Sequence, residues 1–140
     1  MKTADIESRI DALKNRALAQ LDVPEDVAAD ISIETPPNPD MGDRGFPCFV
    51  LARELRNAPP RIAAEVAEVL EDLLDADDII ASVDAVGPYV NVTFDRAKLA
   101  HLVVSQALSD DEFGSQTADE PRHWMFEYSA PNTNKPQHLG

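Results

Sequence analysis

Apolar residues recur at spacings of three and four in four stretches of the chain, and this period predicts helices. The stretches cover about residues 4–21, 47–57, 60–75 and 96–109. Thr3 is suited to cap the first helix, and the prolines that open the second and third are tolerated in a first helical turn. The apolar positions are Ile6, Ile10, Leu13, Ala17 and Leu21, then Phe49, Val50, Ala52 and Leu55, then Ile62, Val66, Val69, Leu70 and Leu73, and finally Leu99, Leu102, Val103 and Leu108.

Three shorter stretches have the composition of β-strands. Residues 31–34 alternate before a proline-rich segment that we expect to be a loop over 36–45. Residues 79–86 are apolar and β-branched, and residues 89–94 alternate Tyr, Asn and Thr with Val, Val and Phe. Because only a Gly-Pro pair separates the last two strands, we expect them to pair antiparallel.

The order of these elements predicts an α+β fold over residues 1–110, in which a small antiparallel sheet packs against helices. A polar linker that contains Gly and Pro follows at 111–122. Residues 123–129 form a further predicted strand that runs into a polar turn, which is how a nucleotide-binding, Rossmann-type α/β domain begins. We therefore expect residues 123–140 to be the start of a second domain, cut before its first helix.

The charge of the chain is strongly negative, because 26 acidic residues stand against 12 basic ones and the net charge is −14. Such a surface repels nucleic acid in dilute salt. The acidity can serve solubility in strong salt, attract a basic partner, or conceal a local positive patch. The acidic residues are spread along the chain rather than collected in a tail, which favours the first interpretation.

A local positive patch is nevertheless present between residues 41 and 62. This segment carries four arginines and two acidic residues, so it is positive within a negative chain. One interpretation is salt bridging along helix surfaces, and the other is a face that contacts phosphate groups. The four arginines are Arg44, Arg53, Arg56 and Arg61.

The sequence carries no signal for a membrane, for secretion or for a structural metal. No stretch reaches the roughly 18 apolar residues of a membrane helix, and the N-terminus lacks the apolar core of a signal peptide. A single cysteine, Cys48, excludes an internal disulfide and suits a reducing cytoplasm, where we expect the protein to work. His101 and His123 have no partner at metal-ligand spacing, and the acidic residues at 75–78 are unspecific, so no metal site is expected.

The chain ends in a dense series of polar residues, FEYSAPNTNKPQHLG. This series resembles the opening of the catalytic domain of class I arginyl-tRNA synthetases, where an acidic residue and an aromatic precede Ser-(Ser/Ala)-Pro-Asn, Lys-Pro and His-x-Gly-His. The second histidine of that signature would follow Gly140, so we expect the sequence to be the N-terminal piece of a longer enzyme. The matching positions are Glu127, Tyr128, Ser129, Ala130, Pro131, Asn132, Lys135, Pro136, His138, Leu139 and Gly140.

The resemblance implies that the intact enzyme joins arginine to its tRNA with ATP and Mg²⁺, through an arginyl-adenylate. A histidine in such a site can donate to phosphate oxygens as charge develops, and a lysine supplies a point charge. The present chain would lack most of that site, so we expect it to be inactive and to hold no cofactor. The matching residues are Glu127, Ser129 and Asn132 for arginine, and Lys135, His138 and Gly140 for catalysis with ATP.

The first 110 residues resemble the additional N-terminal domain of the same family. MGDRGFPCFVLARELRNAPPRIAAEVAEVL is similar to its helical pair, and AVGPYVNVTF is similar to its Ala-Gly-Pro-(Gly)-Phe-Ile-Asn strand. The chain departs from that strand in three ways: Val86 replaces the alanine, the second glycine is absent, and Tyr89 stands where many bacterial members have phenylalanine. In the family this domain holds the elbow of the tRNA and contacts a base of the D-loop. The matching positions are Tyr89, for stacking, and Asn91, for hydrogen bonding to the base edge, which share one face of a strand.

The sequence therefore supports two alternative functions. The first is a tRNA-recognition domain of an arginyl-tRNA synthetase, with tRNA for arginine as its partner and the four arginines as candidate phosphate contacts. The second is an interaction domain whose acidic face binds a basic protein, and it predicts no affinity for tRNA in any salt. A complete small enzyme is disfavoured, because a catalytic group so near a chain end is hard to hold in place. In each case we expect a monomer with no membrane or DNA partner.

Overall fold

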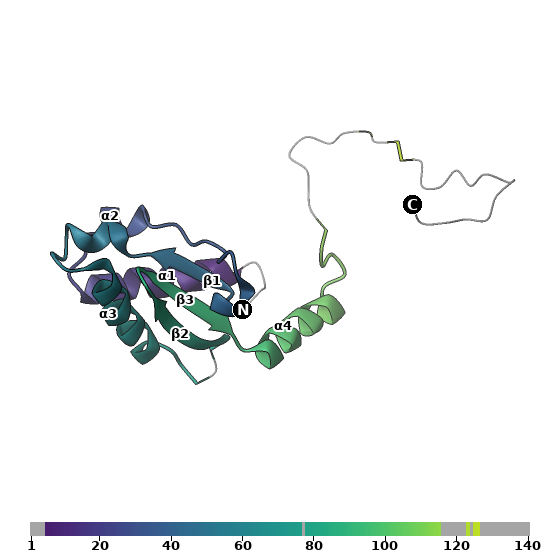
Figure 1. Ribbon diagram of the computed structural model, residues 1–140. Helices are drawn as coiled ribbons and strands as arrows, with labels where there is room; N and C mark the ends of the chain where they lie inside the picture. Colours follow the sequence, from purple (N-terminus) through teal and green to yellow (C-terminus); the bar gives the residue numbers. More distant parts are fainter. Residues whose placement is uncertain (1–4, 77, 116–122, 124, 127–140) are drawn as a thin grey trace, which may run out of the picture.

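The structure is a computed structural model, and it describes residues 5–76, 78–115, 123 and 125–126 (Figure 1). No helix within these residues is long and apolar enough to cross a membrane. Two short 3-10 helices, η2 (Pro39–Met41) and η3 (Phe49–Ala52), accompany the longer elements. The longer elements follow in the order α1 (Ile6–Gln20), α2 (Glu25–Ala29), β1 (Arg44–Pro47), α3 (Pro59–Asp72), β2 (Ile80–Val86), β3 (Tyr89–Phe94) and α4 (Arg96–Ser109).

The described strands form one antiparallel sheet in the order β1-β3-β2, so β3 lies in the centre (Figure 1). β2 and β3 confirm the predicted hairpin, and Gly87 turns the chain between them with a left-handed φ of 58°. Helices α1, α3 and α4 confirm the helices predicted at 4–21, 60–75 and 96–109. Together these elements confirm the predicted α+β class.

The helix predicted at 47–57 is wrong. Its first residue ends strand β1, and only the single turn η3 follows, with further turns as far as Arg56. Arg56 has a φ of 49°, which a right-handed helix cannot continue through. Leu51, which the helical spacing did not select, is fully buried, as is Cys48.

Two smaller differences lie nearer the N-terminus. Residues 31–34 do not form the predicted strand, and only Glu34 makes an isolated bridge to Gly45, because the two prolines that follow cannot donate to a longer ladder. The five-residue helix α2 was not predicted, since it is too short to show a helical period. Thr3, the predicted cap of α1, lies outside the described residues.

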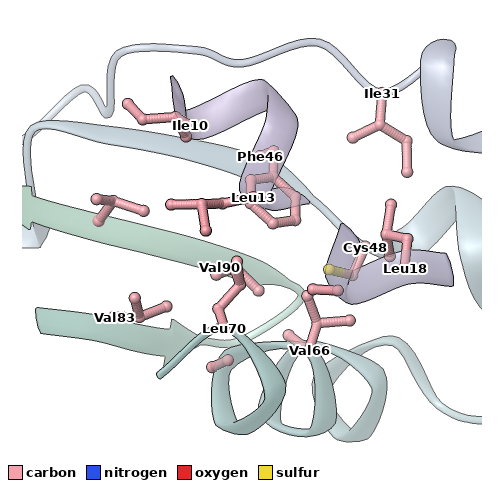
Figure 2. Packing of buried hydrophobic residues seen from close by; sticks show 14 of the residues in the cluster. Ile10, Leu13, Leu18, Ile31, Phe46, Cys48, Val66, Leu70, Val83 and Val90 are labelled. Carbon is pink, nitrogen blue, oxygen red and sulfur yellow. The ribbon is translucent and has the colours of Figure 1, made fainter. Parts of the chain in front are cut away.

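The core lies between one face of the sheet and the helices α1 and α3 (Figure 2). β3 sends its Val and Phe residues to this face, as its alternation predicted. Cys48 is buried in the same cluster, and burial raises the pKa of its thiol to about 12, so it acts as a small apolar side chain. The labelled core residues of Figure 2 are Ile10, Leu13, Leu18, Ile31, Phe46, Cys48, Val66, Leu70, Val83 and Val90.

Helix α4 projects from the end of β3 and buries none of its residues (Figure 1). Asp95 caps it by accepting hydrogen bonds from the backbone N–H groups of Lys98 and Ala97, and the bond from Lys98 lowers the pKa of the Asp95 carboxyl. The Nζ of Lys98 donates to the carbonyl oxygens of Ala76 and Asp78, at 2.7 and 2.9 Å. These bonds tie the first turn of α4 to the loop before β2.

The acidic side chains face solvent over most of the described surface. We expect the melting temperature to rise between low salt and about 1 M NaCl, because salt screens the repulsion among these charges. Each kcal/mol of screened repulsion would raise the melting temperature by about 4–8 °C in a domain of this size. Ion pairs engage Glu7, Asp11, Asp43, Asp75 and Asp78.

Thermal melting by circular dichroism across a salt series tests this expectation. A matched variant replaces the exposed Glu68, Glu71 and Asp72 of α3 with their amides and should show a shallower rise. A melting temperature that stays flat or falls with salt would show that self-repulsion does not limit stability.

Candidate functional site

Tyr89 and Asn91 lie on the face of the sheet opposite the core, as the alternation of β3 predicted. In the sheet register, Asn91 is flanked by Gly45 of β1 and by Asp84 of β2. Part of this face is covered by residues 34–41, which connect the bridge at Glu34 to β1. The face is therefore not a uniformly solvated surface.

A hollow of about 170 Å³ lies over Asn91, and we call it the Asn91 pocket. Pockets that enclose a whole drug-sized ligand measure about 300–1,000 Å³, so this one suits a single planar group of a larger ligand. Prolines, a methionine and a tyrosine make most of its wall apolar. Its lining residues are Glu34, Thr35, Pro36, Pro37, Met41, Gly45, Tyr89 and Asn91.

The side chain of Asn91 has unused hydrogen-bonding capacity. The residue is 2% exposed, and its Nδ2 has no hydrogen-bond partner. An unpaired buried amide donor costs about 1–3 kcal/mol, and folded proteins contain few of them. A ligand that offers an acceptor in the Asn91 pocket would recover that cost, so the geometry favours a binding role over a structural one.

Gly45 holds open the space that the Asn91 amide occupies. A Cβ atom at Gly45 would collide with Oδ1 of Asn91 and would lie 3.0 Å from the carbonyl oxygen of Val90. The backbone of Gly45 also exchanges two hydrogen bonds with Glu34, at 2.8 and 2.9 Å, which bring the covering loop to the pocket. Gly45 was not among the predicted site residues, because its position beside Asn91 depends on β1, which was not predicted.

Gly42 and Asp43 fix the register of β1 on β3. Gly42 has a φ of 123°, and Asp43 donates its backbone N–H to the carbonyl oxygen of Val92 at 2.8 Å. The carboxylate of Asp43 accepts a hydrogen bond from the N–H of Phe94 and pairs with Arg96, both at 2.8 Å. This bonding sets which β1 residue lies beside Asn91 and therefore determines the floor of the pocket.

Lys14 supports the covering loop from inside the protein. It is 1% exposed, and its Nζ donates to the carbonyl oxygen of Ile31 at 2.6 Å and to Asp11 at 2.7 Å. A lysine is rarely buried this fully unless its ammonium group is paired. The contact with Ile31 anchors the start of the segment that goes on to line the Asn91 pocket.

The rim of the pocket is aromatic. Tyr89 is half-buried, and its ring meets the ring of Phe49 edge to face, with centroids 6.2 Å apart and planes at 77°. Phe49 and Val50, two apolar positions of the helix predicted at 47–57, are 50% and 45% exposed.

The structure separates the four arginines of the positive patch. Arg53, Arg56 and Arg61 are exposed, and their side chains form no ion pair with another described residue. Arg44 instead pairs with Glu7 of α1 at 3.3 Å and lines a different hollow. The salt-bridge interpretation therefore holds for Arg44. Arg53 and Arg56 follow η3 and Arg61 lies in α3, and none of these three forms such a pair among the described residues.

The predicted catalytic segment lies outside the described residues, and so does most of the strand predicted at 123–129. Within that strand, His123, Met125 and Phe126 are described, and these three are exposed and form no strand. In the part of the chain that the structure describes, no three His, Cys, Asp or Glu side chains are grouped so as to hold a metal ion. The residues outside it are Glu127, Ser129, Asn132, Lys135, His138 and Gly140.

Comparison with known proteins shows the family to which the chain belongs. Residues 6–94 match the family described as the arginyl tRNA synthetase N terminal domain. The arginine–tRNA ligase of Treponema denticola is 42% identical over 113 residues, which cover 79% of this chain and 19% of that protein. The arginine–tRNA ligase of Clostridium perfringens is 40% identical over 109 residues, which cover 77% and 18%.

A solved structure shows the same fold. The arginyl-tRNA synthetase of Thermus thermophilus matches with a TM-score of 0.56 at 25% identity, over 84% of this chain and 17% of that one. The present chain therefore spans about a fifth of the length of the relatives that it matches.

Proposed function

Because the chain belongs to the arginyl-tRNA synthetase N-terminal domain family, we propose that it is the tRNA-recognition part of an arginine–tRNA ligase. In this proposal the Asn91 pocket receives one base from the D-loop of tRNA for arginine. The observation that carries the proposal is the unpaired Nδ2 of Asn91, buried at the floor of a hollow with an aromatic rim.

The chemistry of the pocket suits a base from an RNA loop. Loop bases are unstacked, so they can stack on an aromatic ring and offer their edges for hydrogen bonds. Tyr89 supplies the ring at the rim, and the amide of Asn91 can both donate and accept at the floor. Because Asn91 is 2% exposed, the covering residues 34–41 must shift as the base enters.

The free arginines suit the phosphate groups beside such a base. Arg53, Arg56 and Arg61 project from a chain of net charge −14, and none has to leave an ion partner among the described residues to reach a phosphate. Arg44 would have to leave Glu7. We therefore assign the phosphate contacts to Arg53, Arg56 and Arg61, and binding should weaken steeply as salt is raised.

The activity of the whole protein is part of the same proposal. As a monomer in the cytoplasm, it would use ATP, with Mg²⁺, to form an arginyl-adenylate and then arginyl-tRNA. The chain segment 127–140 would contribute to that active site, and the chain by itself is expected to be inactive. Arginine would contact Glu127, Ser129 and Asn132, and ATP would contact Lys135 and His138, with Gly140 in the same signature.

Removing the ring of Tyr89 tests the proposed function. A stacked base contributes about 1–3 kcal/mol, so Tyr89→Ala should weaken binding of tRNA for arginine by about 5- to 150-fold, whereas Tyr89→Phe should keep most of the affinity. The measurement is fluorescence anisotropy of labelled tRNA with the 140-residue chain at several salt concentrations. A tRNA altered only in its D-loop should lose the difference between the wild-type chain and Tyr89→Ala.

Two outcomes would contradict the proposal. Equal binding of tRNA by the wild-type chain and by Tyr89→Ala would show that the affinity does not come from the Asn91 pocket. No binding at any salt would favour the alternative, an acidic domain that binds a basic protein.

A further inference from the structure

A second aromatic surface adjoins the Asn91 pocket. Phe49 opens η3 directly after Cys48, whose backbone N–H donates to the carbonyl oxygen of Pro88 at 2.7 Å. This bond joins the end of β1 to the turn between β2 and β3. It therefore holds Phe49 close to Tyr89, the first residue of β3, where the two rings meet at 77°.

The exposure of Phe49 has no explanation within the fold. Full burial of a phenylalanine side chain would stabilise the protein by about 1.5–3 kcal/mol, yet Phe49 remains 50% exposed while Leu51, two residues later, is fully buried. Val50 is 45% exposed, and Val86, which is the register partner of Tyr89, is 41% exposed. A connected apolar surface beside a pocket is typical of a binding surface.

We propose that Phe49 stacks on a second base, the neighbour in sequence of the base that enters the Asn91 pocket. The proposal rests on the proposed function and adds a second subsite to it. Two rings at 77° cannot each lie flat on bases that remain stacked on one another. The ligand is therefore a single-stranded step of two nucleotides whose bases are splayed apart, a geometry that an RNA loop offers and a helix does not.

The charge near Phe49 favours RNA over a protein partner for this surface. Arg53 follows four residues later, and Arg53 and Arg56 are exposed with no ion partner among the described residues. An aromatic ring beside free arginines is the combination that binds single-stranded nucleic acid, in which the arginines contact the backbone and the ring contacts the base.

The test compares three variants at Phe49 on defined RNA. The probe is tRNA for arginine, intact or assembled by ligation with an abasic nucleotide at one of the two neighbours of the base that Tyr89 recognises. Phe49→Ala and Phe49→Leu should each weaken binding of the intact tRNA by about 5- to 150-fold, and Phe49→Trp should restore it. Leucine keeps the apolar contact with Tyr89, so it separates stacking from packing.

The abasic tRNAs decide between stacking and a positioning role. If Phe49 stacks on a neighbouring base, the wild-type chain should bind one of the two abasic tRNAs more weakly than the intact tRNA. The Phe49→Ala chain should bind that abasic tRNA and the intact tRNA equally. If Phe49 only orients Tyr89, the losses from Phe49→Ala and from either abasic site will add, and the proposal is overturned. Melting temperatures close to that of the wild-type chain would show that the variants fold, as the exposure of Phe49 leads us to expect.

Tyr89→Ala separates this proposal from the one on which it rests. If Tyr89→Ala weakens binding and Phe49→Ala does not, the second subsite is wrong and the proposed function stands. If neither variant changes binding, or the wild-type chain does not bind, both proposals fail together.

Discussion

Replacing Gly45 with alanine is expected to weaken binding of tRNA for arginine by about 100-fold, because the stacked base and its hydrogen bonds are lost together. The new methyl group would collide with Oδ1 of Asn91 and press on the carbonyl oxygen of Val90. Asn91 would have to leave the pocket floor, or β1 would have to move away from β3. Overpacking of this kind also lowers the free energy of unfolding by about 1–3 kcal/mol.

A double-mutant cycle separates the two effects of Gly45→Ala. Asn91→Ala alone should abolish recognition without destabilising the fold, because it removes an unpaired buried amide. In the Asn91→Ala background, Gly45→Ala should lower the free energy of unfolding by less than it does in the wild-type chain, because the colliding side chain is gone. Urea unfolding and tRNA anisotropy on the four proteins give both quantities. A Gly45→Ala protein with wild-type affinity for tRNA would show that the Asn91 amide does not bind the base.

Truncating Lys14 to alanine is expected to have the largest effect on stability, a loss of about 2–5 kcal/mol in the free energy of unfolding. Lys14 is 1% exposed, so its removal leaves a cavity as well as a buried carbonyl oxygen, that of Ile31, without its donor. The segment that starts at Ile31 continues into the wall of the Asn91 pocket. Affinity for tRNA should therefore fall with stability.

Lys14→Met is the matched control for this prediction. Methionine fills nearly the same space without a charge, so it restores packing but not the bond to Ile31. We expect Lys14→Met to lower the free energy of unfolding by about 1–3 kcal/mol, the usual cost of an unpaired buried carbonyl. Urea unfolding measures both variants. A Lys14→Met protein as stable as the wild-type chain would mean that the volume of Lys14 matters and its ammonium group does not.

The elements that could be predicted are those whose pattern is local. Helix α3 repeats apolar residues over 14 positions, and the β2–β3 hairpin combines β-branched residues with a glycine turn. Strand β1 could not be predicted, because its four residues, Arg-Gly-Phe-Pro, have no strand pattern of their own. They form a strand because β3 is available to pair with them, and that partner lies more than 40 residues later in the chain.

The candidate site divides in the same way. Tyr89 and Asn91 became candidates through the resemblance of the sequence to a family, whereas Gly45 and Phe49 become candidates only through the contact of β1 and η3 with β3. Counting charges located the arginine segment, but it could not show that Arg44 meets Glu7 on α1. Pairing partners that are distant in the chain are the information that periodicity and composition lack.

The central position of β3 has a consequence for how the pocket responds to fluctuation. β3 is hydrogen-bonded to β1 on one side and to β2 on the other, so Asn91 cannot leave the sheet unless both ladders open. Backbone amides of β3 should exchange with deuterium only through near-global unfolding, whereas those of α4 should exchange through local opening. In the proposed complex the RNA would therefore meet a preorganised floor, and little of the binding free energy would be spent on ordering that floor.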